Sequence, residues 1–306
     1  MKNTYFHLTE QSFEFPQNGF ELKNGFLTFH NVSLEHLIKK HGTPFRLFYL
    51  PNIAEKIKQA RDLFNKAFKK HHYLGKYQYC YCTKSNHFSH TVSAALKENI
   101  HLETSSSFDI DLILNLYKEG KVTKDIIVIN NGYKTEEYLK KILSLCEVGF
   151  KNVIVVLDNQ PELERLNRLL KNTKKKIKIG IRMAINEEAQ SSYYTSRMGI
   201  RHNKINDFYI KEVKNNPSFE LKMLHFYVDS GIKDSLYFWG EFKKALKLYL
   251  ELKKECKSLN SFNIGGGFPI RNNLGFNYDY EKITEKIVQN IAENCNNESI
   301  HHPDIY

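Results

Sequence analysis

The sequence lacks any apolar run long enough to cross a bilayer. Its longest apolar stretches, such as Val153–Leu157, have the length of a buried strand. The first residues mix charged, polar and aromatic side chains, without the apolar core that a secretion signal contains. We therefore expect neither a membrane partner nor export.

Cysteine is also scarce. The five cysteines are an odd number and lack the regular spacing of a disulfide framework. Cys80 and Cys82 are separated by one residue, whereas zinc-binding pairs have at least two residues between them. His87 and His90 lack both the H-E-x-x-H pattern and an ordered third ligand. These absences favour a reducing, cytoplasmic setting and no metal site.

The common nucleotide-binding glycine patterns are missing as well. Gly265-Gly266-Gly267 follows an apolar stretch, but the Gly-Lys-Ser/Thr that completes a Walker A loop does not follow it. Ile270 stands where a dinucleotide fingerprint has its third glycine. The sequence therefore disfavours both of these phosphate-binding classes.

Apolar residues are plentiful. The 306 residues are 41% hydrophobic and 13% aromatic, which is enough to fill one large α/β barrel or two ordinary domains. The net charge of +11 would suit an anionic partner such as nucleic acid. The basic residues are nevertheless spread among glutamates on predicted helices, and Lys171–Lys178 is most simply a solvated connection. A nucleic-acid-binding module therefore remains an alternative that we do not prefer.

From Lys76 onward, apolar strands alternate with amphipathic helices, which is typical of parallel βαβ units. Seven strands and a possible eighth are predicted at Tyr77–Cys82, Ile100–Glu103, Ile126–Ile129, Val153–Leu157, Ile177–Met183, Leu221–Val228, Phe262–Ile264 and 304–306. Eight such units match a closed (β/α)8 barrel. An open, doubly wound sheet competes, but the notable residues follow many strands rather than one switch point.

The first residues do not share this alternation. Strands are predicted at Leu27–His30 and Phe45–Leu50, with a helix at Val32–His41 between them. A second helix begins at Pro51 and carries an apolar stripe. We therefore treat residues 1–50 as a separate segment and residues 51–306 as the barrel domain.

Lys84 ends the first predicted barrel strand. Side chains alternate along a strand, so Cys80, Cys82 and Lys84 should share one face. A lysine at this place packs poorly but is suited to forming a Schiff base. The alternative is an ordinary surface charge, because most lysines are exposed.

Polar residues also mark other predicted strands. Glu103 is either a site carboxylate or an acid that caps the next helix. Arg182 faces inward and needs an anionic partner, unless it lies past the strand end in solvent. Gly265–Gly267 would let main-chain N–H groups approach an anion, or would form a plain loop. His225 and Tyr227 share one face of the sixth strand.

In order, these motifs resemble the fold-type III pyridoxal-phosphate-dependent basic amino acid decarboxylases, the ornithine, diaminopimelate and arginine decarboxylase family. The motifs are Tyr81–Asn86, Leu102–Ser106, Ser196–Ile200, His225–Gly231 and Asn263–Pro269. The resemblance covers roughly residues 40–306. Leu224-His225-Phe226 and Leu102–Ser106 are most similar to the biosynthetic arginine decarboxylase branch.

The resemblance implies an alanine racemase-like (β/α)8 TIM barrel that binds pyridoxal 5′-phosphate. Lys84 would hold the cofactor as a Schiff base, and Gly265, Gly266 and Gly267 would bind its phosphate together with Ser230. Arg182 matches an arginine near the cofactor ring, and Glu103 matches an acid that lines the site. The implied activity is a carbon–carbon lyase of polyamine biosynthesis that converts arginine to agmatine and CO₂, in a homodimer.

Two departures qualify this expectation. The family places a ring-stacking histidine three residues before the phosphate-side serine, where this sequence has Tyr227. The family also continues past the eighth strand with an acid, a Gly-Arg pair and a β-domain, whereas this sequence stops at Tyr306. We therefore expect a truncated chain of low activity, with residues 1–50 from an otherwise missing β-domain. The alternative is a non-catalytic, single-barrel cofactor-binding or regulatory paralogue.

Overall fold

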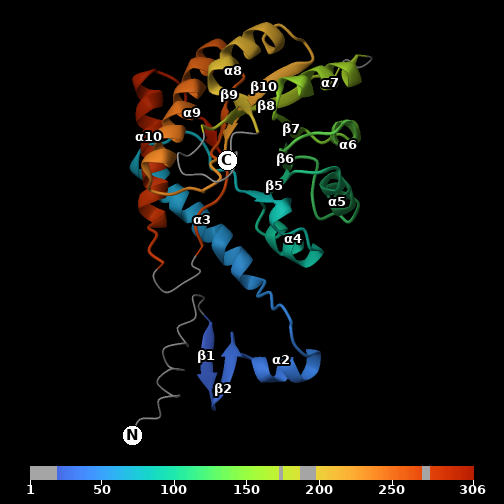
Figure 1. The fold of residues 1–306 in the computed structure, drawn as a ribbon, viewed down its shortest axis with the longest axis vertical. Helices are drawn as coiled ribbons and strands as arrows, with labels where there is room; N and C mark the ends of the chain where they lie inside the picture. The colour runs from blue at the N-terminus through green and yellow to red at the C-terminus, as the bar shows by residue number, and fades with distance from the viewer. Residues whose placement is uncertain (1–18, 172–174, 187–197, 271–275) are drawn as a thin grey trace. The chain divides into compact units, whose positions relative to one another are not determined.

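The structure is a computed structural model that describes residues 19–171, 175–186, 198–270 and 276–306 (Figure 1). The described residues divide into two compact units. The smaller unit comes from Met1–Tyr49 and Phe268–Asp279, and the larger from Leu50–Gly267 and Tyr280–Tyr306. Ser196 and Arg197, which begin one of the motifs above, lie outside the described residues.

The smaller unit contains an antiparallel sheet. Its strands are β1 (Phe20–Lys23), β2 (Phe26–Phe29) and β3 (Val32–Ser33), and helix α2 (Leu34–His41) follows. Ser33 caps this helix, because its hydroxyl accepts a hydrogen bond of 3.2 Å from the His36 N–H.

The predicted strand at Phe45–Leu50 is wrong. Residues 45–49 have no regular secondary structure, and residue 50 lies in a turn. Tyr49 instead packs through its ring, which stacks on His30 with 3.6 Å between ring centroids. An alternating apolar pattern indicates which side chains are buried, but a strand also needs a neighbouring main chain to pair with.

Eight parallel strands form the centre of the larger unit. In spatial order they are β4 (Cys80–Cys82), β5 (His101–Thr104), β6 (Ile127–Asn130), β7 (Asn152–Leu157), β8 (Ile177–Ala184), β10 (Phe219–Phe226), β11 (Ser261–Asn263) and β12 (Asp304–Ile305). The ladder closes on itself, because Ile305 pairs with Tyr77 just before β4. The predicted barrel is therefore confirmed, and the open sheet is excluded.

Helices surround these strands (Figure 1). They are α3 (Pro51–Lys70), α4 (Ser89–Leu96), α5 (Ser107–Lys118), α6 (Glu136–Val148), α7 (Gln160–Leu170), α8 (His202–Phe208), α9 (Leu236–Glu255) and α10 (Tyr280–Asn297). A two-residue strand, β9 (Ile200–Arg201), pairs with β8, and a π-helical turn, Tyr209–Val213, follows α8. None of the helices among the described residues has the length and apolar character needed to span a membrane.

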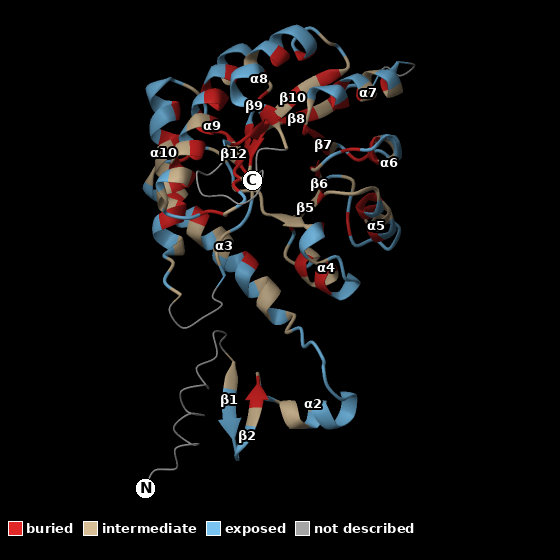
Figure 2. Cartoon of the chain, in the orientation of Figure 1, coloured by how far each residue is buried: buried red, intermediate tan, exposed pale blue. Residues whose placement is uncertain are grey.

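Most of the barrel strands are largely buried on both faces, as parallel strands in α/β proteins are, although β4 contains no buried residue. Figure 2 shows buried residues gathered on the strands and on the helix surfaces beside them. In β7, Val153–Leu157 are all buried. Inside, Ile129, Ile154, Val156 and Met223 form a packed cluster. This apolar filling closes the barrel below the carboxyl ends of its strands.

A close main-chain approach accompanies the closure of the barrel. A Cβ atom added to Gly75 would lie 2.1 Å from the carbonyl oxygen of Pro303. The Tyr73 hydroxyl donates a hydrogen bond of 2.7 Å to the same oxygen. A side chain on residue 75 would therefore clash with the main chain that leads into the last strand.

We expect Gly75→Ala to lower the free energy of unfolding by about 1–3 kcal/mol, because the added methyl overpacks this approach. Gly240→Ala in α9 is a matched control, since nothing lies within 4 Å of its added Cβ. The control should raise stability by about 0.5–1 kcal/mol, as alanine does in a helix interior. Urea unfolding measures both effects, and equal stability of the two variants would contradict the prediction.

Candidate functional site

Three of the predicted site residues meet at the carboxyl ends of the strands. Lys84 lies in a 3₁₀ turn, Thr83–Ser85, directly after β4, rather than on the strand itself. Its Nζ atom is 5.7 Å from the centroid of the Tyr227 ring, and the Arg182 guanidinium carbon is 5.8 Å from the same centroid. One aromatic ring therefore has two cations within the range of cation–π attraction.

The glycine segment packs against the turn that follows Tyr227. Added Cβ atoms would lie 2.8 Å from the Phe226 carbonyl oxygen at Gly265 and 2.8 Å from the Gly231 Cα at Gly267. Both glycines also have positive φ, +71° and +94° respectively, which disfavours any other residue. Ser230 lies in this turn, immediately before Gly231.

The glycine segment presents N–H groups with different roles. The Gly265 N–H donates a hydrogen bond of 2.8 Å to Asn263 Oδ1, so it is used within the protein. Within the described part of the chain, the N–H groups of Gly266 and Gly267 make no hydrogen bond. No described atom would lie within 4 Å of a Cβ added to Gly266. The segment therefore combines two available donors with open space, which is what an anion requires.

A layer of polar side chains crosses the barrel beside the glycine segment. The Asn131 amide nitrogen donates to Glu103 Oε1 at 3.3 Å and to His225 Nε2 at 3.1 Å. Glu103 also accepts a contact of 3.8 Å from the Cys82 thiol. Burial, followed by the Glu103 charge, raises the pKa of Cys82 to about 12, so the thiol keeps its proton. Sequence reasoning missed Asn131, although it directly follows an apolar strand.

His225 is buried and neutral. Burial, followed by the nearby Arg182 charge, lowers the pKa of His225 to about 3. Since Nε2 accepts from Asn131, the neutral ring carries its proton on Nδ1. His225 therefore occupies the barrel interior, while Tyr227, two residues later, is the aromatic side chain beside Lys84.

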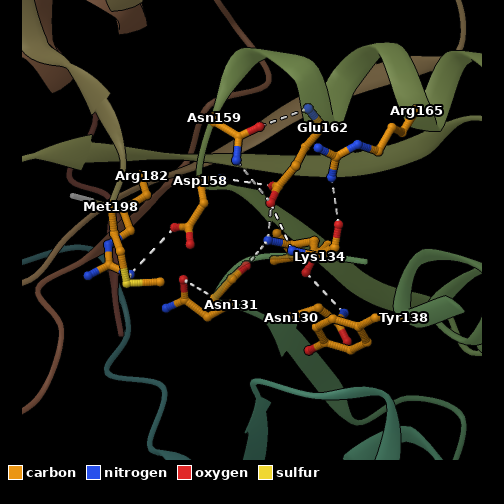
Figure 3. A network of polar contacts seen from close by, with 12 residues as sticks. Asn130, Asn131, Lys134, Tyr138, Asp158, Asn159, Glu162, Arg165, Arg182 and Met198 are labelled. Carbon is orange, nitrogen blue, oxygen red and sulfur yellow. Dashed lines mark hydrogen bonds and ion pairs between the residues drawn. The ribbon is translucent and has the colours of Figure 1, made fainter. Parts of the chain in front are cut away.

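Arg182 has the anionic partner that its inward position required. Its Nη1 lies 3.4 Å from Asp158 Oδ1, at the end of β7, and the Asp158 side chain is buried. A second ion pair, between Lys134 and Glu162 at 3.2 Å, lies next to it with both side chains fully buried (Figure 3). Sequence reasoning did not single out Asp158, Lys134 or Glu162.

A cavity of about 540 Å³ lies elsewhere, between α7, β9 and α8. Its lining mixes acidic and basic side chains, such as Glu164, Arg201 and Lys204. None of the predicted site residues lines it. We therefore place the candidate site at the strand ends around Tyr227.

Comparisons with known proteins bear on this site. Residues 54–306 match the family model described as pyridoxal-dependent decarboxylase, pyridoxal binding domain. Biosynthetic arginine decarboxylase of Prochlorococcus marinus (strain MIT 9215) is 25% identical over 281 residues, which cover 86% of this chain and 42% of that protein. The biosynthetic arginine decarboxylase of Geobacter sp. (strain M21) is also 25% identical. That match covers 90% of this chain and 45% of the Geobacter protein. The chain thus spans less than half the length of these relatives.

Solved structures share the fold. The biosynthetic arginine decarboxylase SpeA from Campylobacter jejuni superposes with a TM-score of 0.74 at 21% identity, covering 94% of this chain and 50% of that one. Diaminopimelate decarboxylase from M. jannaschi gives a TM-score of 0.77 at 18% identity, covering 95% and 66%. Nearly all of this chain therefore has counterparts in both folds.

The neutral His225 predicts a pH dependence. An unfolded histidine binds a proton below about pH 6.5, whereas the folded protein resists protonation until about pH 3. The contribution of His225 to stability is therefore lost as the pH falls below about 6.5. From about pH 6.5 to about pH 4.5, the wild type should lose on the order of 2 kcal/mol more than His225→Gln. Urea unfolding at each pH checks this, and parallel curves would refute it.

Proposed function

The chain belongs to the family of pyridoxal-dependent decarboxylases, and from this premise we propose that Lys84 holds pyridoxal phosphate for the decarboxylation of a basic amino acid. The membership confirms the resemblance carried by the sequence motifs. One observation carries the proposal: the Lys84 amine and the Arg182 guanidinium carbon lie 5.7 and 5.8 Å from the centroid of the Tyr227 ring, and the glycine segment packs against the same residue.

The residues present fit this cofactor. Pyridoxal phosphate needs an amine for its aldehyde, a flat face for its ring and donors for its phosphate. Lys84 is exposed and makes no ion pair within the described residues, so its amine is available. Tyr227 offers the flat face. The Gly266 and Gly267 N–H groups and the Ser230 hydroxyl are the proposed phosphate donors, and Gly265 shapes the segment.

When bound, the cofactor supplies an electron sink for the electron pair that remains when the Cα–carboxylate bond breaks. The chain's own residues bind and orient. Arg182 places its guanidinium beside Tyr227 and pairs with Asp158 in the protein interior. His225 remains neutral and adds no third charge. Glu103 lines the strand ends, where Asn131 connects it to His225.

Arginine is our proposed substrate, converted to agmatine and CO₂. The support is the pair of motifs that resemble the biosynthetic arginine branch, together with relatives named biosynthetic arginine decarboxylase. We also propose a homodimer and a cytoplasmic location. Because the chain spans less than half the length of these relatives, cofactor binding is the property to test first on it.

We expect the chain to develop a visible absorbance band with pyridoxal phosphate, because the cofactor reacts with the Lys84 amine. Borohydride reduction and peptide mass spectrometry should then find a pyridoxyl group on Lys84. Lys84→Ala should lose both signals, whereas Lys97→Ala, at an exposed helix end, should keep them. A band that persists in Lys84→Ala would reject the assignment.

The same variants test the reaction itself. CO₂ release would be measured from arginine, ornithine, lysine and diaminopimelate, with arginine expected to be fastest. A pyridoxyl group on Lys84 without CO₂ from any of the four would favour the non-catalytic, cofactor-binding alternative.

Gly266→Ala separates phosphate binding from folding. The added methyl meets no described atom, so the free energy of unfolding should change by less than about 1 kcal/mol. The methyl would occupy the space proposed for the phosphate, so the Kd for pyridoxal phosphate should rise about tenfold or more. Absorbance titration and urea unfolding measure the two quantities, and an unchanged Kd would exclude Gly266 from the phosphate site.

A further inference from the structure

We propose that Glu162 is a positioning residue for the site: it fixes Asp158, which in turn holds Arg182 beside the Tyr227 ring, and Lys134 is its counter-ion. The inference deepens the proposed function. It rests on that function only for the role of Arg182 in cofactor binding. The connection between Glu162 and Arg182 stands on the contacts in Figure 3.

Glu162 binds two loops at once. Its Oε1 accepts a hydrogen bond of 2.9 Å from the Lys134 N–H, after β6. Its Oε2 accepts one of 2.9 Å from the Asp158 N–H, after β7, and pairs with Lys134 Nζ at 3.2 Å. A single carboxylate, fully buried in the first turn of α7, therefore sets the spacing of two strand-end loops.

Asp158 is held on both sides of its main chain. The Asp158 N–H donates to Glu162, and the Asp158 carbonyl oxygen accepts a hydrogen bond of 3.0 Å from the Gly199 N–H. With the main chain fixed, the Asp158 side chain points toward Arg182, as Figure 3 shows. Its Oδ1 lies 3.4 Å from Arg182 Nη1, and its buried Oδ2 has no hydrogen bond among the described residues. Arg182 is thus the described cation that this carboxylate contacts.

Lys134 makes the buried Glu162 charge tolerable. Burial lowers the pKa of Lys134, while the Glu162 charge opposes that effect. Lys134 Nζ also donates a hydrogen bond of 2.5 Å to the Gly132 carbonyl oxygen. The Lys134 carbonyl oxygen accepts a hydrogen bond of 2.8 Å from Arg165 Nη1. The set holds two oppositely charged pairs: Lys134 with Glu162, and Arg182 with Asp158.

Another helix provides a comparison. In α5, buried Asp109 accepts hydrogen bonds from the Ser105 and Ser106 N–H groups at 2.9 and 3.0 Å. It therefore fixes the loop after β5 just as Glu162 fixes the loop after β7. Among the described residues, however, no ion pair connects Asp109 to a cation of the site. Both carboxylates thus cap a loop. Of the two, Glu162 is the one connected to Arg182, through Asp158.

The test is a double-mutant cycle on the full chain, with Glu162→Gln and Arg182→Lys made singly and together. Glutamine keeps the size of Glu162 but offers one oxygen instead of two. The Kd for pyridoxal phosphate should rise about tenfold in Glu162→Gln, yet the substitution should add little once Arg182 is already changed. The control, Asp109→Asn, should have the same effect in both backgrounds.

The same cycle is run without cofactor, by urea unfolding. Glu162→Gln and Arg182→Lys should lower the unfolding midpoint less than additively, whereas Asp109→Asn and Arg182→Lys should be additive. If the wild type binds no cofactor, the proposed function fails, but this cofactor-free cycle still decides the inference. If Glu162→Gln does not fold, the charge-balanced pair Lys134→Met with Glu162→Gln replaces it in the cycle. Additive effects of Glu162 and Arg182 in the cofactor-free cycle overturn the proposal.

Discussion

The site depends on the main-chain pairing that closes the barrel. Ile305 donates from its N–H to the Lys76 carbonyl oxygen and accepts from the Gln78 N–H, each at 2.8 Å. Along the sheet, β4 and β10 would otherwise be separated by four intervening strands. Closure brings Lys84, after β4, to Tyr227, after β10, across only β12 and β11. Since all eight strands are parallel, their carboxyl ends also meet at one rim.

Charged side chains inside the barrel form pairs of opposite charge. Glu162 faces Lys134, and Asp158 faces Arg182. Burial of an unpaired charge is strongly unfavourable, so these pairs permit ionic groups where an apolar residue would otherwise be needed. Lys84 stands apart from these pairs, exposed and without an ion pair among the described residues. Its amine is therefore available for a ligand, which is consistent with the role we propose for it.

The barrel could be predicted from the sequence because its strands are apolar and regularly spaced, as Val153–Leu157 is. The strand-end positions of Arg182 and Tyr227 followed from that order. The 3₁₀ turn at Lys84 did not, because the end of a short strand depends on the neighbouring strand it pairs with.

The connection from Glu162 to Asp158 was not predictable from the sequence either. Glu162 reads there as an ordinary acid in the first turn of a helix, with Asn159 as the cap. Its bonds to the Lys134 and Asp158 N–H groups depend on how two loops approach each other.

The resemblance noted above expects a histidine at the position of Tyr227, and two cations lie beside this ring. An imidazole beside the Lys84 amine and the Arg182 guanidinium would favour its neutral form, since a third positive charge there is repelled. A phenol ring carries no such charge, and its face attracts both cations. His225 does not replace the missing imidazole, because it is buried against Asn131. Tyrosine thus keeps an aromatic face in the site while stabilising the two positive groups that the proposed chemistry requires.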